Sequence, residues 1–207
     1  MKTFYLLAAL FFSACLLPAQ AGEAPDVKLK ATISKALDVF YGAGAEASSP
    51  EEKREQIRGI LSESYDLSVI VRRAMGRNWN QLSESQQKEV LDLFEQLVVK
   101  VTYEGLTGTA EPQISYGALV TVTDKRVEVP STVTADGKTY NLVYRLGLLQ
   151  SGWQIYDIVA EDISLVSNYR QQFDDHFRRS DGAALVAKLK ELLNKETLDL
   201  DNNELSL

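Results

Sequence analysis

Between residues 153 and 173 the chain reads Trp153-Gln-Ile-Tyr-Asp-Ile-Val-Ala-Glu-Asp-Ile-Ser-Leu-Val-Ser-Asn-Tyr-Arg-Gln-Gln-Phe173. Residues 153–160 alternate as in a β-strand, and we expect two largely apolar faces. The predicted faces are Trp153, Ile155, Asp157 and Val159 on one side, and Tyr156 and Ile158 on the other. From Ile163 the period becomes helical, because Val166, Tyr169 and Phe173 recur at helical spacing. The stretch therefore predicts a strand that leads directly into a helix, with other elements covering both strand faces.

The first residues of the chain are typical of a secretory signal peptide. Lys2 precedes an apolar run over residues 4–17, and Ala19-Gln-Ala21 is a small-x-small cleavage site. The apolar run is shorter than the roughly 20 residues that span a bilayer. We therefore expect cleavage after Ala21 and export of the remaining chain. A lipoprotein signal that uses Cys15 is the alternative interpretation.

Cleavage at this point would change the composition of the protein. Cys15 is the only cysteine, so the mature chain would have no disulfide and no thiolate. Lys2 leaves with no acidic residue, which moves the net charge from −7 to −8. An acidic chain argues against nucleic acid as a partner, since nucleic acid selects a basic surface. We expect a soluble single domain over residues 22–195 and a polar C-terminal tail over residues 196–207.

Hydrophobic spacing and capping signals predict the helices. Ser49 and Ser83 each begin a capping box, Asp66 is a helix cap, and Gly76 is a stop signal. The long helix after Ser83 has a wide apolar stripe and should be the most buried. The expected helices are residues 27–41, a helix from Pro50, and residues 67–75, 84–103, 163–178 and 181–194.

Between the helices lies a region rich in Val, Tyr and Thr, which favours strands. The expected strands are residues 118–123, 126–134, 139–147 and 153–160. Asp136-Gly137 marks a hairpin turn that needs a positive φ, and short connections make the sheet antiparallel. The fold class is therefore α+β, with a curved antiparallel sheet of about four strands and helices packed on one face.

The residues give little support for catalysis. His176 is the only histidine, so a zinc or iron site lacks ligands. Asp174-Asp175 is typical of a solvated helix face. Asp157 lies mid-strand among apolar residues and needs a partner, and Arg145 and Arg170 are the candidates. A cavity enzyme with Asp157 as acid or base is the alternative to a binding protein.

The 153–173 stretch resembles the hallmark of the MlaC family of periplasmic phospholipid-binding proteins, once called toluene-tolerance proteins. That family typically reads Trp-x-Val-x-Asp-x-x-x-Glu-Gly-x-Ser-Leu-x-x-Asn-Tyr-Arg-x-x-Phe. The matching positions are Trp153, Asp157, Glu161, Ser164, Leu165, Asn168, Tyr169, Arg170 and Phe173. Asp162 departs from the usual Gly, and we expect it to be tolerated as an N-terminal helix residue. The resemblance covers residues 25–195, although Met75 stands where Leu is usual.

The resemblance implies a fold related to nuclear transport factor 2, with an apolar cavity between sheet and helices. It implies a periplasmic phospholipid carrier that keeps lipid out of the outer leaflet and needs no cofactor or metal. The implied partners are an outer-membrane lipoprotein–porin complex and an inner-membrane ABC transporter complex with a lipid-binding subunit. A packed binding module without a cavity remains a further alternative, and the lipid could be a phospholipid or a hopanoid.

Alternation along the strands and spacing along the helices select the residues expected to line that cavity. The predicted lipid-binding residues are Phe94, Leu97, Val101, Val129, Val133, Leu142, Tyr144, Ile155, Val159, Tyr169 and Phe173. Val143, Tyr156 and Ile158 are the choice if the other strand face is concave. Asp157, Arg145 and Arg170 are expected to act in structure or in partner contacts.

Overall fold

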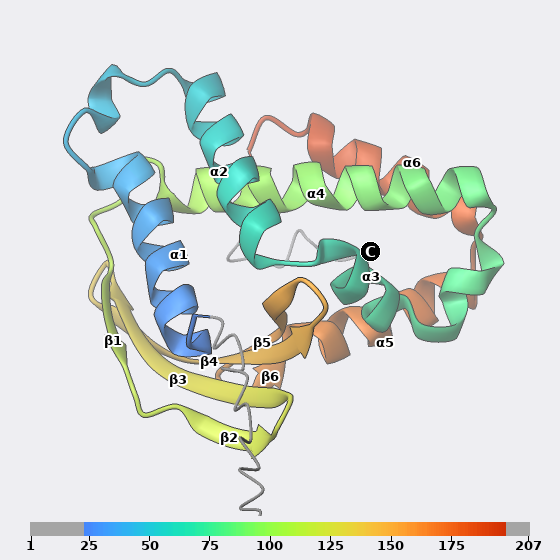
Figure 1. Ribbon diagram of the computed structural model, residues 1–207. Coiled ribbons are helices and arrows are strands. Elements are labelled where there is room, and N and C mark those ends of the chain that lie inside the picture. Colours follow the sequence, from blue (N-terminus) through green and yellow to red (C-terminus); the bar gives the residue numbers. More distant parts are fainter. Residues whose placement is uncertain (1–22, 198–207) are drawn as a thin grey trace, which may run out of the picture.

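The computed structural model describes residues 23–197, and it has the predicted α+β architecture (Figure 1). The predicted signal segment and the predicted tail beyond residue 197 lie outside the described residues. The helices are α1 (Pro25–Tyr41), α2 (Pro50–Ser64), α3 (Leu67–Met75), α4 (Glu84–Leu106), α5 (Leu165–Phe177) and α6 (Gly182–Asn194), with short 3₁₀ helices at Ala45–Ala47 and Gly76–Gln81. The strands are β1 (Gln113–Tyr116), β2 (Val120–Thr123), β3 (Arg126–Ala135), β4 (Lys138–Leu149), β5 (Gly152–Ala160) and β6 (Ile163–Ser164).

The helices begin where the capping signals predicted. The hydroxyl groups of Ser49 and Ser83 accept hydrogen bonds from the backbone N–H groups of Glu52 and Gln86, and both capping boxes are complete. Asp66 caps α3 by accepting from the N–H of Val69. These side chains bind donors that a helix leaves without an intrahelical partner, which sets the first residue of each helix.

The sheet has six strands rather than the four expected from the sequence. Its order is β1-β3-β4-β5-β6, and β2 pairs with another part of β3. All of these pairings are antiparallel. The two additional strands, β1 and β6, have four and two residues, and β6 is too short to show an alternating pattern.

A β-bulge in β5 changes which residues share a face. Arg145 pairs with Asp157, but the next residue, Leu146, pairs with Ile155, so Tyr156 is left out of the ladder. The expected alternation from Trp153 to Val159 is therefore wrong, because one extra residue reverses the faces beyond it. Register places Ile155 and Ile158 with Tyr144 and Leu146, whereas Asp157 and Val159 lie on the opposite face.

Two turns use positive φ angles. Asp136 and Gly137 have φ values of 48° and 75°, as expected for the β3–β4 hairpin. Glu161 and Asp162, with φ values of 45° and 64°, form the equivalent turn between β5 and β6. Asp162 is thus a turn residue and not the expected first residue of a helix. The cap of α5 is Ser164, whose hydroxyl accepts from the N–H of Ser167.

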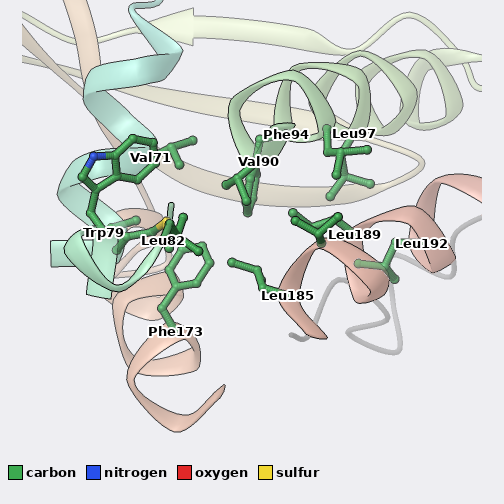
Figure 2. Close-up of a cluster of buried hydrophobic side chains, with 14 of the residues drawn as sticks. Val71, Trp79, Leu82, Val90, Phe94, Leu97, Phe173, Leu185, Leu189 and Leu192 are labelled. Carbon is green, nitrogen blue, oxygen red and sulfur yellow. The ribbon is translucent and has the colours of Figure 1, made fainter. Parts of the chain in front are cut away.

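The core has a large helical part, a sheet part, and a smaller cluster of Val39, Ile57 and Val99 where α1, α2 and α4 meet. In the helical part, α6 packs along α4, and leucines of α6 face Val90, Phe94 and Leu97 (Figure 2). In the sheet part, α1 lies across the curved sheet (Figure 1), and its Leu29 packs with Val129 and Tyr144. Among residues 23–197, no helix has the length and apolar character that a membrane span requires.

Candidate functional site

A cavity of about 400 Å³ lies between the two parts of the core. We call it the inner cavity, and its volume is within the roughly 300–1,000 Å³ typical of ligand pockets. Helices α2, α3, α4 and α5 and strand β5 form its wall. The lining residues are Leu61, Tyr65, Leu67, Ile70, Val71, Ala74, Phe94, Leu97, Val98, Val101, Thr102, Ile155, Asp157, Ile158, Leu165, Val166, Tyr169 and Phe173. Nearly all are apolar, so the space suits a hydrocarbon group rather than a polar substrate.

Part of the predicted lining set lies on this wall. The members that line the inner cavity are Phe94, Leu97, Val101, Ile155, Tyr169 and Phe173. Phe94, Tyr169 and Phe173 form a cluster in which ring centroids lie 5.8–6.5 Å apart. Phe94 belongs to α4, whereas Tyr169 and Phe173 belong to α5, more than 70 residues later in the chain. Their role in ligand binding stays a prediction.

The remaining predicted lining residues lie elsewhere. Val129 and Tyr144 are buried in the sheet part of the core, and Leu142 packs against them. Val133 pairs with Ile114 and Tyr140, away from the cavity wall. Val159 is on the other face of the sheet, because of the bulge at Tyr156. Helix α1 packs on this face of the sheet at β3 and β4, where its Leu29 meets Val129 and Tyr144.

Several lining residues were not predicted from the sequence. Leu67, Ile70, Val71 and Ala74 of α3 recur at i, i+3, i+4 and i+7, so helical spacing was the signal that could have identified them. Leu61 and Tyr65, at the end of α2, follow Ile57 at four-residue spacing, which is a weaker form of the same signal. The alternative lining set was Val143, Tyr156 and Ile158. Only Ile158 of these three lines the inner cavity.

Asp157 connects the sheet to the beginning of α5. Its Oδ1 accepts from the N–H of Val166 at 3.1 Å, and its Oδ2 accepts from the hydroxyl of Ser164 at 2.7 Å. Arg145 Nη1 donates to the same Oδ2 at 3.2 Å, and Arg145 Nε donates to Glu128 at 2.9 Å. Burial opposes the charge of Arg145, but these two carboxylates raise its pKa. Because both oxygens of Asp157 already accept hydrogen bonds, the geometry favours a structural role over acid–base catalysis.

Arg170 has a different partner from the one expected. Its guanidinium donates to the backbone carbonyl of Arg73, in the last turn of α3, and not to Asp157. A cation at this end of a helix satisfies a carbonyl without an intrahelical donor and interacts favourably with the helix dipole. Arg170 therefore joins α5 to α3, on two sides of the inner cavity.

Two of the four polar side chains on the cavity wall are phenols, those of Tyr65 and Tyr169, and the other two are Thr102 and Asp157. Burial raises the pKa of both Tyr65 and Tyr169, so each stays protonated and neutral at ordinary pH. In residues 23–197, no group of three or more His, Cys, Asp or Glu side chains could hold a metal ion. His176 Nε2 contacts the carbonyl oxygen of Asp181 at 3.0 Å, and Asp174 accepts from Asn78. Neither His176 nor Asp174 lines the inner cavity.

A second hollow, of about 510 Å³, adjoins the inner cavity. We call it the outer hollow. The two adjoin at Leu61, Tyr65, Leu67 and Val98, which line both. Its other lining residues are mostly polar or charged: Arg58, Ser62, Asp66, Ser68, Leu91, Asp92, Glu95, Ser151 and Gln154. The outer hollow therefore has more polar side chains around it than the inner cavity.

Comparisons with known proteins identify a family and solved structures with a related fold. The family model described as MlaC protein matches residues 30–191. A phospholipid-binding protein from Ralstonia solanacearum, solved in complex with a phospholipid, is 24% identical with a TM-score of 0.72, over 82% of this chain and 96% of that one. A domain of unknown function with a cystatin-like fold from Nostoc punctiforme has a TM-score of only 0.36 at 16% identity, over 82% and 99% of the two chains. No curated protein matches the chain.

Proposed function

Since the chain belongs to the MlaC protein family, we propose that it binds phospholipid and carries it across the periplasm. The inner cavity is the observation that supports this most directly, because its wall is apolar and it adjoins a hollow with several polar and charged side chains. The phospholipid bound to the Ralstonia solanacearum protein supports the same ligand class. Residues 22–195 act as one lipid-binding domain after cleavage following Ala21.

Transfer of acyl chains out of water is the physical basis of the carrier. Each buried methylene contributes about 0.8 kcal/mol, so a 16-carbon chain contributes roughly 12 kcal/mol. A lipid crosses an aqueous space slowly unless a protein covers those chains. The inner cavity holds the chains while the headgroup stays in the outer hollow, in contact with water. Lipid passes between an outer-membrane lipoprotein–porin complex and an inner-membrane ABC transporter complex with a lipid-binding subunit.

A space-filling substitution in the inner cavity tests the proposal. Val101→Trp places an indole where the chains would lie, whereas in a filled core the same change overpacks and costs about 1–3 kcal/mol. We expect Val101→Trp to stay folded and to lose most of the phospholipid that co-purifies with the wild type, measured by mass spectrometry of solvent extracts. Val122→Trp is the matched control, because Val122 is 50% exposed on β2 and should keep the wild-type lipid content. A wild-type protein without any lipid, together with an unfolded Val101→Trp, would end the carrier interpretation.

A further inference from the structure

Two of the four polar side chains on the wall of the inner cavity already have hydrogen-bond partners. Thr102 Oγ1 donates to the carbonyl oxygen of Val98 at 2.8 Å. Both oxygens of Asp157 accept hydrogen bonds from the surrounding protein. The other two side chains are the phenols of Tyr65 and Tyr169, and in the described part of the chain neither hydroxyl group has a hydrogen-bond partner. The wall thus presents two donors that the protein itself does not satisfy.

Both hydroxyl groups border open space. The inaccessible side-chain polar atoms without a partner, within residues 23–197, are Ser131 Oγ and Gln154 Oε1, so the two phenol oxygens are not among them. Although neither tyrosine is exposed on the surface, each phenol oxygen therefore keeps accessible area. Tyr169 lines the inner cavity and not the outer hollow, whereas Tyr65 lines both where they adjoin. A ligand in these spaces would meet both groups.

Burial decides what the two phenols can do. It raises the pKa of Tyr65 and of Tyr169, so both stay neutral O–H donors at ordinary pH. A donor in bulk water exchanges one partner for another with little net gain, but a donor held in an apolar surrounding gains from an acceptor. A hydrocarbon chain has no acceptor. The ester carbonyl oxygens that join acyl chains to glycerol are acceptors directly beside the hydrocarbon.

Resting on the proposed function, we propose that Tyr65 and Tyr169 select diacyl lipids by donating hydrogen bonds to the ester carbonyl oxygens of the acyl chains. Tyr65 lies where the apolar cavity adjoins the more polar outer hollow, and a lipid changes there from hydrocarbon to headgroup. Tyr169 lies on the cavity wall beside the rings of Phe94 and Phe173. A diacyl lipid has two ester carbonyls, as many as the wall has donors without a partner. A diether lipid has the same chains and headgroup but neither carbonyl.

Competition between an ester lipid and its ether analogue measures this selectivity. The purified protein is incubated with vesicles of equal parts dioleoyl phosphatidylcholine and the matching dioleyl ether lipid, and bound lipid is quantified by mass spectrometry. Headgroup and chain length are identical, so only the carbonyl oxygens differ. One net hydrogen bond corresponds to about a fivefold preference, and we expect the ester lipid to exceed the ether lipid by about this factor or more.

Removal of the two hydroxyl groups tests whether they cause the preference. Tyr65→Phe/Tyr169→Phe keeps both rings and should take up the two lipids nearly equally, with little change in total lipid. Tyr103→Phe/Tyr140→Phe is the matched control, because neither residue lines the inner cavity or the outer hollow, and it should keep the wild-type preference. After removal of lipid, the urea midpoint of Tyr65→Phe/Tyr169→Phe should be no lower than that of the wild type, because the protein supplies no partner for either hydroxyl group.

The outcomes distinguish this inference from the proposed function. Equal uptake of ester and ether lipid by the wild type would overturn the carbonyl contacts and leave phospholipid binding intact. A preference that persists in Tyr65→Phe/Tyr169→Phe would also overturn them, because another group would then be responsible. A lower urea midpoint for the lipid-free variant would contradict them too, since the hydroxyl groups would then have partners in the protein. Uptake of neither lipid would overturn the proposed function itself.

Discussion

Asp157 and Asp162 lie five residues apart in the same motif and do different things. Asp157 is 6% exposed, and its carboxylate satisfies a helix donor, a hydroxyl and a guanidinium. Asp162 holds a left-handed backbone conformation that Gly adopts without steric cost. The usual Gly of the family at this position is therefore explained by the turn between β5 and β6, and not by a helix start.

Asp162→Gly should stabilise the protein. Glycine removes a steric cost of about 1–2 kcal/mol from the folded state. It also makes the unfolded chain more flexible, which lowers the free energy of unfolding by about 0.4–1 kcal/mol. We expect a net gain of about 0.5 kcal/mol in urea unfolding. Asp124→Gly is the control, since Asp124 is a turn residue outside the left-handed region and its replacement should be neutral or destabilising. A lower midpoint for Asp162→Gly would contradict the explanation.

Tyr144 should make stability depend on alkaline pH. Burial, with a smaller effect of Tyr116, raises the pKa of Tyr144 to about 12, against about 10 in an unfolded chain. Its neutral form therefore stabilises the fold fully below pH 10, and this contribution of about 2–3 kcal/mol is lost as pH rises through 12. The free energy of unfolding is measured at pH 9 and at pH 12. Tyr144→Phe should show a smaller decrease between these two pH values than the wild type does. Tyr140→Phe, at a residue 41% exposed on the same strand, should leave the loss unchanged.

Helix α5 is the element that closes the inner cavity. Asp157 and Ser164 bind its first N–H groups, and Arg170 joins it to the end of α3. Its Phe173 is 1% exposed, whereas Tyr169 is only partly buried and faces the cavity. Both residues line the inner cavity, but Phe173 is fully buried in the core, whereas Tyr169, one turn earlier, is only partly buried.

Alanine substitutions on α5 should separate these two roles. Phe173→Ala should cost about 3–5 kcal/mol, as large aromatic truncations in a core do. Tyr169→Ala should cost clearly less, because its ring already borders an open space, and it should lower lipid content more per unit of lost stability. Chemical denaturation and lipid mass spectrometry on the same preparations provide both values. Equal destabilisation by the two changes would mean that Tyr169 is an ordinary core residue.

At the scale of the whole molecule, two packed cores leave a space between them. Helices α3 to α6 form one core, and α1 forms the other with the sheet. Most of each core lies away from the cavity wall, and we therefore expect the helices and the sheet to stay folded without an occupant. The occupant still stabilises the protein, since it binds the folded state only.

Removal of lipid should therefore lower the melting temperature without unfolding the protein. A ligand at about 100 times its Kd stabilises by roughly 2.7 kcal/mol, which corresponds to about 5–10 °C for a domain of this size. Calorimetry of lipid-loaded and delipidated protein gives the difference, and circular dichroism checks that the delipidated form keeps its helices. Restored melting temperature after incubation with vesicles is the expected control. Identical transitions for both forms would contradict a ligand inside the cavity.

The sequence by itself determined the helices of this protein and four of the six strands in residues 23–197. Capping boxes at Ser49 and Ser83, the cap at Asp66 and the turn at Asp136-Gly137 are local signals, and each acts within a few residues of its position. The 153–173 motif also predicted the family that the match over residues 30–191 confirms. Local hydrogen bonding and hydrophobic period are sufficient for these conclusions.

Only the tertiary structure decided which residues surround the cavity. A single bulged residue, Tyr156, moves Val159 to the other face, and no periodicity in the sequence marks it. Helix α1 covers Val129 and Tyr144, so residues on the correct face of the sheet are core and not wall. Both effects depend on contacts between segments far apart in the chain, such as Leu29 with β3 and Tyr65 with Ile155. A sequence can indicate that one face of a strand is buried. Only the packing of distant segments decides whether a helix or a cavity lies against that face.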